Sequence, residues 1–599
     1  MKKDMKTLKY ILVSMVAAIS FTGCFDLDEE TFDQLDTSKF YTDEQSVQSV
    51  ISSIYAEAMV GYAEYYWYLQ EFSADQVAWR TWNGGLWGWD EAYKFVLSSH
   101  TWDAESTVIK QSWELGWKTI GLCNNALNDL TKLSAEDVGL SREKLDSYIA
   151  EVRTLRAWCY YNLFEIWGGA LPLNTVVGSD IPGSASKDFD EGCQIIYNFL
   201  CEELDESWSA LPQNKVNRMN QAMNRMLKMR LLLNANIFIG EEKFAECEEL
   251  AQDILDGVYG SYSIAENYRD IYAYNNDTCP EVVFAFASDV AHLNVDWIRT
   301  VPFFPSNTTL NDFFGCSDVS GGWNCTMLAP SYDNSASLQE GGSPVCFLDA
   351  PYNDRLGCVY ERFQIGDIRR ANYACDETGM PNNGMFVQGE MRANYGAGDV
   401  LLADADRDGQ PLHYVDQLGT FLNLGRNLEP VMSPRWGETN SGVRLVKYPI
   451  YTDAAGINFR EADEVEFRLS EVVYTLAECK LRSGDSEGAK ALVNSVKERY
   501  FSAADWTKAQ NEWTSRGYTE FNEEWMLNEW GIEFLNEGRR RRTDLRRFDK
   551  FTQGQWWFFG EATEDGISLP AQRDRKYEWF PLPASAINVN PGLVQNPNY

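Results

Sequence analysis

Hydrophobic residues recur at helical spacing over several long segments, and glycine-containing breaks separate these segments. Within residues 143–167, Ile149, Val152 and Leu155 fall on one face of a helix. One pair of predicted helices flanks Gly240, in the helix–turn–helix layout of tetratricopeptide-like repeats. The same periodicity predicts further helices at 43–60, 105–133, 218–239, 242–256, 465–482 and 486–499.

The helical periodicity fades between about 261 and 462, where Gly, Pro, Asn, Asp and Ser become frequent. Residues 280–286 in this region have the pattern of a buried strand, and the remainder indicates long loops. We therefore predict a mainly α protein with few short strands. A tetratricopeptide-like helix-pair scaffold would occupy about 40–260 and 463–548, and the loop-rich insertions would lie between them.

The amino-terminal segment has the layout of an export signal. A basic start precedes an apolar run at 10–21, which is too short for a membrane-spanning helix of roughly 20 residues. The run ends in small residues before Cys24. We expect 1–23 to be a lipoprotein signal peptide, Cys24 to carry lipid, and 24–599 to form a single domain. A secreted protein without lipid is the alternative.

The charge and the histidine count exclude several classes of function. The net charge is −37, which disfavours binding to the phosphates of nucleic acids. The chain contains only three histidines, which argues against most zinc and serine–histidine sites because both usually recruit imidazole.

Aromatic residues make up 14 % of the chain, and four tryptophans lie among glycines and polar residues between positions 79 and 89. Sugars stack on flat rings and offer hydroxyl groups to amides, carboxylates and guanidinium groups, so this mixture predicts a glycan-binding loop. A second aromatic patch is expected further along the chain. Packing of these tryptophans on one another is the alternative. The candidate glycan-binding residues are Asp75, Arg80, Trp82, Asn83, Trp87, Trp297 and Trp323.

Residues 404–409 resemble the start of an EF-hand calcium loop, because Asp404, Asp406 and Asp408 alternate before a glycine. Position 12 of such a loop would be Val415, where a bidentate glutamate belongs. The match is incomplete. The alternatives are a structural calcium ion and a polar Asp–Gly turn, and no other cofactor is predicted.

Several segments together resemble the SusD/RagB family of nutrient-binding outer-membrane lipoproteins, in order and over most of the chain. The segments are 151–161 (EVRTLRAWCYY) with 167–173 (WGGALPL), 280–286 (PEVVFAF), 366–370 (GDIRR) with 442–448 (GVRLVKY), 467–478 (FRLSEVVYTLAE), 529–540 (EWGIEFLNEGRR) with 544–547 (DLRR), and the tail at 580–597. One departure is Gly531, where the family commonly carries Arg, so we expect a locally weaker helix. We interpret Arg153, Arg156, Glu537 and Arg539 as members of ion pairs between helices.

The resemblance implies a SusD-like helical domain whose long loops bind the ligand, with contacts near Asp75. It also implies a surface-exposed protein that is anchored to the outer membrane by lipid and covers a SusC-like TonB-dependent transporter. The expected function is capture of an oligosaccharide or polysaccharide without catalysis. A surface glycoside hydrolase, and the same architecture binding peptide or another nutrient, remain the alternatives.

Overall fold

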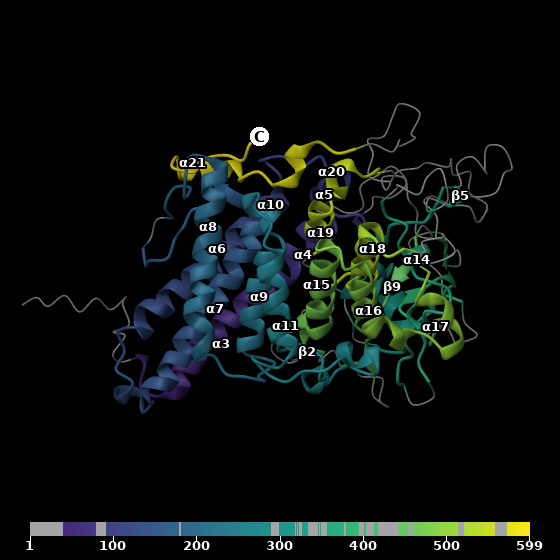
Figure 1. Ribbon diagram of the computed structural model, residues 1–599, viewed down its shortest axis with the longest axis horizontal. Coiled ribbons are helices and arrows are strands. Elements are labelled where there is room, and N and C mark those ends of the chain that lie inside the picture. The colour runs from purple at the N-terminus through teal and green to yellow at the C-terminus, as the bar shows by residue number, and fades with distance from the viewer. Residues whose placement is uncertain are drawn as a thin grey trace, which may run out of the picture.

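A computed structural model describes most of the chain between Phe40 and Tyr599. The described residues are 40–79, 92–178, 181–288, 299–317, 319, 322, 326–333, 345–346, 348, 356–376, 379–394, 401–402, 412–416, 442–452, 458–459, 462–512, 520–538, 540–556 and 572–599. Figure 1 shows the helices of the amino-terminal half packed side by side at the left. The carboxyl-terminal helices follow in the centre, the loop-rich region lies at the right, and the carboxyl-terminal tail crosses the top.

Long antiparallel helices form the scaffold, and most of them match the predicted segments. Helix α7 begins after Ser141, whose side chain accepts a hydrogen bond from the backbone N–H of Lys144 at 3.2 Å. It ends at Gly168, where φ is +55°. The helices of the amino-terminal half are α3 (Glu44–Gly61), α4 (Trp67–Glu71), α5 (Ala92–Ser99), α6 (Thr107–Leu130), α7 (Arg142–Trp167), α8 (Phe189–Ser207), α9 (Gln221–Leu233), α10 (Ala235–Ile239) and α11 (Phe244–Leu255).

The predicted helix at 218–239 is divided at Asn234, and the predicted helix at 465–482 begins with a strand. The prediction of paired helices is confirmed where α6 packs on α7, α7 on α8, and α15 on both α16 and α11. The later helices are α12 (Asn307–Phe314), α14 (Val359–Arg362), α15 (Leu469–Arg482), α16 (Ser486–Lys497), α17 (Ala503–Ala509), α18 (Glu523–Glu533), α19 (Arg541–Arg547), α20 (Lys550–Gln553) and α21 (Ala584–Val589).

The described strands are short and form two-stranded antiparallel pairs. The predicted strand at 280–286 is confirmed as β2, which pairs with β12 and so joins the loop-rich region to the scaffold. The strands are β1 (Val77–Trp79), β2 (Val282–Phe286), β3 (Thr326–Leu328), β4 (Tyr332–Asp333), β5 (Val345–Cys346), β6 (Phe386–Val387), β7 (Gly389–Glu390), β8 (His413–Tyr414), β9 (Arg444–Leu445), β10 (Tyr451–Thr452), β11 (Asn458–Phe459) and β12 (Glu464–Arg468).

Buried ion pairs connect the motif residues, as the sequence suggested. Arg153 and Arg156 of α7 both pair with Glu203 of α8, at 2.6 and 2.7 Å. Glu537 accepts hydrogen bonds from Arg468 and Lys447, whereas Arg539 lies outside the described residues. These contacts satisfy charges that would otherwise be costly to bury.

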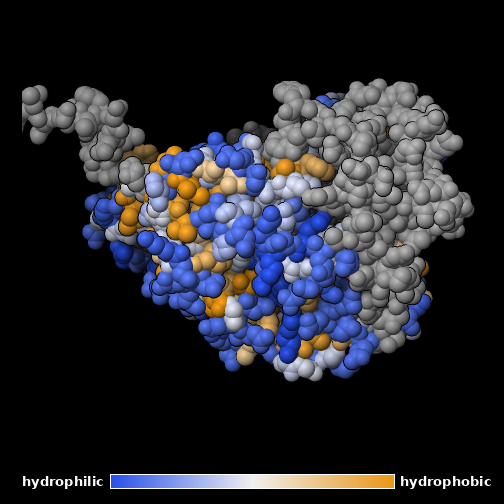
Figure 2. All heavy atoms as spheres, turned by 90° about the horizontal axis from the view of Figure 1, so that it is seen from above, coloured by the Kyte–Doolittle hydropathy of each residue, from blue (hydrophilic) through white to orange (hydrophobic). Residues whose placement is uncertain are grey.

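The face of the molecule seen from above is largely hydrophilic, with smaller hydrophobic patches gathered toward the left half of the view (Figure 2). Among the residues that the structure describes, none belongs to a helix with the length and apolar character needed to cross a bilayer.

Candidate functional site

A two-stranded ladder of β1 and β3 lies at the root of the predicted aromatic loop. The strands are antiparallel, with Trp79 opposite Thr326 and Val77 opposite Leu328. The chain therefore leaves β1 at the same end of the ladder at which it enters β3. The predicted residues that follow β1 or precede β3 lie outside the described residues: Arg80, Trp82, Asn83, Trp87 and Trp323.

The predicted tryptophans of these segments are near the ladder along the chain. Trp82 follows Trp79 by three residues, and Trp323 precedes Thr326 by three. The structure thus brings together the points at which the two predicted aromatic segments attach. Trp297 also lies outside the described residues, and a helical turn that follows it, Val301–Phe303, packs against β3.

The two ends of the segment 80–91 are held close together by α5. The backbone N–H of Trp79 donates to Ser98 Oγ at 2.9 Å. From the same helix, Lys94 donates to the hydroxyl of Tyr68 at 3.1 Å and places Nζ 4.5 Å from the Trp79 ring centroid. The segment between β1 and α5 therefore begins and ends on one rigid, buried base.

The structure corrects the predicted role of Asp75. Its side chain is buried, with 0 % of the residue exposed. Arg541 of α19 binds both carboxylate oxygens, at 2.6 and 2.9 Å, and the N–H of Gly357 donates to Oδ2 at 3.1 Å. Burial alone would raise the pKa of Asp75, but the Arg541 guanidinium and these hydrogen bonds hold that pKa below its ordinary value. Asp75 therefore fixes the start of β1 to the scaffold instead of facing a ligand.

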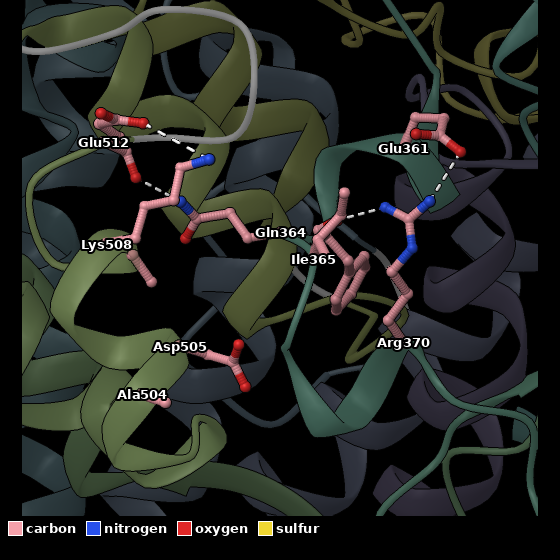
Figure 3. Close-up of a pocket in the computed structure, with 10 residues that line it drawn as sticks. Glu361, Gln364, Ile365, Arg370, Ala504, Asp505, Lys508 and Glu512 are labelled. Atoms are coloured by element: carbon pink, nitrogen blue, oxygen red, sulfur yellow. Dashed lines mark hydrogen bonds and ion pairs between the residues drawn. The ribbon is translucent and has the colours of Figure 1, made fainter.

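A pocket of about 230 Å³ lies between α17 and the loop after α14 (Figure 3). Arg370 donates to Glu361 at 2.7 Å and to the carbonyl of Phe363 at 2.6 Å on one side. On the other side, the amide of Gln364 donates to the carbonyl of Glu512. Ile365 stands at the opening and is 80 % exposed. The pocket combines apolar and hydrogen-bonding groups, and no feature of the sequence beyond the nearby GDIRR motif indicates it.

A second pocket, of about 450 Å³, lies beside β4, β7 and β8. Its lining includes the half-buried Tyr332, Gln388 and His413, which offer a ring and polar groups to a sugar, whereas Tyr414 is buried. Asp416 closes one side and accepts a hydrogen bond from the N–H of Ser331 at 3.1 Å. Burial raises the pKa of Asp416 to about 7. Sequence reasoning missed this pocket, because its residues come from separate parts of the loop-rich region.

The predicted calcium ligands Asp404, Asp406 and Asp408 lie outside the described residues. Asp416, which follows the position of the missing EF-hand glutamate by one residue, faces Ser331. Within the described ranges, no group of three or more His, Cys, Asp or Glu side chains is arranged to hold a metal ion. Calcium binding stays a prediction.

Comparison with known proteins identifies relatives over most of the chain. The model of the SusD family matches residues 280–599. The starch-binding protein SusD of Bacteroides thetaiotaomicron is 22 % identical over 535 residues, covering 86 % of this chain and 83 % of that protein. The SusD-like protein P25 of Formosa agariphila is 24 % identical over 507 residues, covering 82 % and 80 %.

Solved structures share the fold at low sequence identity. Surface glycan-binding protein A from Bacteroides fluxus gives a TM-score of 0.60 at 17 % identity, covering 93 % of this chain and all of that one. A SusD superfamily protein from Bacteroides fragilis gives a TM-score of 0.62 at 16 % identity, covering 94 % of this chain and 100 % of that one. The helix pairs and the loop-rich insertions thus belong to an established architecture.

Proposed function

This chain belongs to the SusD family, and on that premise we propose that it binds a glycan at the cell surface without cleaving it. The observation that carries the proposal is the family match, which covers the loop-rich region and the carboxyl-terminal scaffold. The printed descriptions of relatives as starch-binding and glycan-binding proteins support the class of ligand.

The binding site that we propose is built on the β1–β3 ladder. Indole rings stack on the apolar faces of sugars, and the neighbouring polar groups bind hydroxyls. The rigid base under the ladder supports this assignment, because a side chain attached to a fixed backbone loses less conformational freedom on binding. The site would use Arg80, Trp82, Asn83, Trp87, Trp297 and Trp323.

We further propose that the protein is anchored in the outer membrane through lipid on Cys24 and passes its ligand to a SusC-like TonB-dependent transporter. The signal-like segment before Cys24 supports the anchor, and the acidic residues at 26 and 28–30 resemble a surface-export signal. Replacing Cys24 with Ala should release the protein from membranes. Affinity purification of the wild-type protein from its own cells should recover a TonB-dependent channel. Retention of the Ala variant in membranes, or recovery of no channel, would contradict this assignment.

Affinity gels containing plant and host polysaccharides test the proposed site. The triple variant Trp82→Ala, Trp87→Ala, Trp323→Ala should migrate as it does in a gel without polysaccharide, because each change removes a stacking surface. Trp506→Ala, in α17, is the control and should be retarded like the wild type.

Incubation of the purified protein with the same glycans and with peptides tests the alternatives. We expect binding to a glycan and no shorter products. Release of oligosaccharides would support a hydrolase with a pair of acidic residues. Binding to peptides alone would show that the cargo is a different nutrient.

A further inference from the structure

A pocket on the helical scaffold contains hydrogen-bond donors that have no acceptor among the described residues. It has a volume of about 400 Å³ and lies between the start of α8, helix α10, the α19–α20 segment and the tail turn Arg575–Glu578. Figure 1 shows α10, α19 and α20 near the top of the molecule, beneath the carboxyl-terminal tail. The volume is within the range of small-molecule sites, roughly 300–1,000 Å³.

The deepest charged group in this pocket is Arg546, which is 6 % exposed. Among the described residues, its guanidinium donates a single hydrogen bond, from Nη1 to the carbonyl of Glu165 at 3.2 Å, and forms no ion pair with a carboxylate. Nε is buried without an acceptor. The neighbouring Arg542 donates to the carbonyls of Tyr577 and Glu578 and has two further nitrogens without acceptors. Arginines that are buried in this way normally have anionic partners.

Two further donors line the same pocket. The NH2 group of Asn236 donates no hydrogen bond to any part of the chain that is described, and its Oδ1 is buried without a donor. The indole N–H of Trp579 also has no acceptor within the described ranges, and the Trp579 ring lies 4.0 Å from the Arg546 guanidinium carbon. A guanidinium, an amide and an indole N–H that share one pocket form a set of donors suited to a carboxylate.

Acceptors occupy the rim of the pocket. Asp190 and Asp549 are exposed, and Glu578 forms an ion pair with the exposed Arg575 at 3.5 Å. These carboxylates would repel a doubly charged phosphate or sulfate more strongly than a ligand with a single negative charge. They would accept hydrogen bonds from hydroxyl groups that surround a single carboxylate.

We propose that this pocket binds a sugar acid, with the carboxylate of the sugar on Arg546, Asn236 and Trp579 and its hydroxyl groups on the acidic rim. Burial lowers the pKa of Arg546 to about 10, so the guanidinium is still charged at neutral pH. This inference rests on the proposed function in one respect, namely that the cargo is a glycan. It adds a second site and a chemical class of ligand.

Isothermal titration of the protein that starts at residue 25 with glucuronic and galacturonic acid at pH 7 tests the proposal. Asn236→Ala and Trp579→Phe each remove one donor and should each weaken binding by about tenfold. Arg546→Gln should abolish binding, and the other two variants decide the result if this one does not fold. Trp506→Phe is the matched control and should leave affinity unchanged. Unchanged affinity in both Asn236→Ala and Trp579→Phe would overturn the proposal.

Three further ligands test the chemical class. Replacing Asn236 with Ala should not change any binding of glucose, because glucose lacks the carboxylate. Acetate and inorganic sulfate should bind at least about tenfold more weakly than the sugar acids, because they lack the hydroxyl groups. Equal affinity for acetate or sulfate would overturn the assignment to a sugar and reveal a simple anion site.

The triple tryptophan variant separates the two sites. It should retain binding of the sugar acids while losing retardation by polysaccharide. Loss of polysaccharide binding only in Asn236→Ala would instead locate the main site in this pocket and contradict the proposed function of the aromatic loop.

Discussion

At the scale of single residues, Gly531 shows how one departure from a family pattern has a local cause. It lies inside α18, and its carbonyl accepts a hydrogen bond from Gln76 at 2.7 Å. A Cβ atom at this position would lie 2.9 Å from Arg541 Nη1 and 2.9 Å from Gln76 Nε2. The absence of a side chain therefore lets Arg541 reach Asp75. The locally weaker helix expected from the sequence stays a prediction.

Replacing Gly531 with Ala should destabilise the protein by about 1–3 kcal/mol, because the new methyl group displaces two buried side chains. Helix propensity alone would predict the opposite sign, by about 1 kcal/mol. The free energy of unfolding in urea measures the change. Gly121→Ala is the matched control inside α6, where a Cβ would meet nothing within 4 Å, and it should raise stability by about 0.5–1 kcal/mol. A stabilised Gly531→Ala would contradict the packing argument.

At the scale of elements, Asn220 joins helix α9 to strand β2. Its side-chain oxygen accepts from the N–H of Met223 at 2.9 Å, as an N-cap does. Its amide group donates to the carbonyl of Val283 at 2.9 Å and to that of Lys215 at 3.0 Å. One buried side chain thus both starts a scaffold helix and fixes the strand that enters the loop-rich region.

Asn220→Ala should lower the free energy of unfolding by about 2–4 kcal/mol, because it removes the cap and leaves the Val283 carbonyl without its donor. Asp188→Ala removes the exposed cap of α8 and should cost only about 0.5–1 kcal/mol. Urea unfolding measures both variants. Equal losses in the free energy of unfolding would show that the hydrogen bond to β2 contributes nothing to stability.

The elements also show where sequence reasoning succeeds. The periodicity predicted α3, α6, α7 and α16 within a few residues of their observed ends, because the spacing of apolar residues in an amphipathic helix marks its buried face. It assigned 465–468 to a helix, whereas these residues form β12, whose alternating Val465 and Phe467 are paired with β2. A short apolar run does not distinguish helix from strand until its partner is known.

The same limit applies to the site. Asp75 has the polar neighbourhood of a ligand contact, but its partner Arg541 lies 466 residues away along the chain. The residues that neighbour Asp75 in the sequence do not indicate its contact with Arg541. The pocket beside β4, β7 and β8 cannot be recognised from the sequence either, since Tyr332, Gln388 and His413 come from three separate segments.

At the scale of the whole molecule, buried carboxyl groups with raised and with lowered pKa values give stability opposite dependences on pH. Burial raises the pKa values of Glu71, Glu165 and Asp416 to about 7 each. Because the folded-state pKa exceeds the unfolded value, these groups stabilise the fold fully below about pH 4 and lose that contribution as the pH rises through 7. Glu471 has the opposite sign. Its pKa is about 2 despite burial, because of Arg230 and Arg540, so its contribution is lost as the pH falls below about 4.5.

We therefore expect maximum stability near pH 5. The free energy of unfolding of Glu165→Gln minus that of the wild type should be about 2 kcal/mol larger at pH 8 than at pH 5. The reason is that the amide carries no charge at either pH, whereas the wild-type carboxyl group becomes charged. Gln70 can accept the new N–H, since its Oε1 has no partner in the described structure. Urea unfolding at both pH values measures this, and a pH-independent difference between the two proteins would contradict the raised pKa.

The anchorage of β1 and α5 has a consequence for how such proteins diversify. Because the N–H of Trp79 donates a hydrogen bond to Ser98 of α5, the twelve positions 80–91 connect two elements that are packed on each other. Insertions or replacements there change the closure entropy only slowly with length, by about 0.6 kcal/mol for each doubling. A segment of different length and composition can therefore replace 80–91 while β1 and α5 keep their contacts with each other.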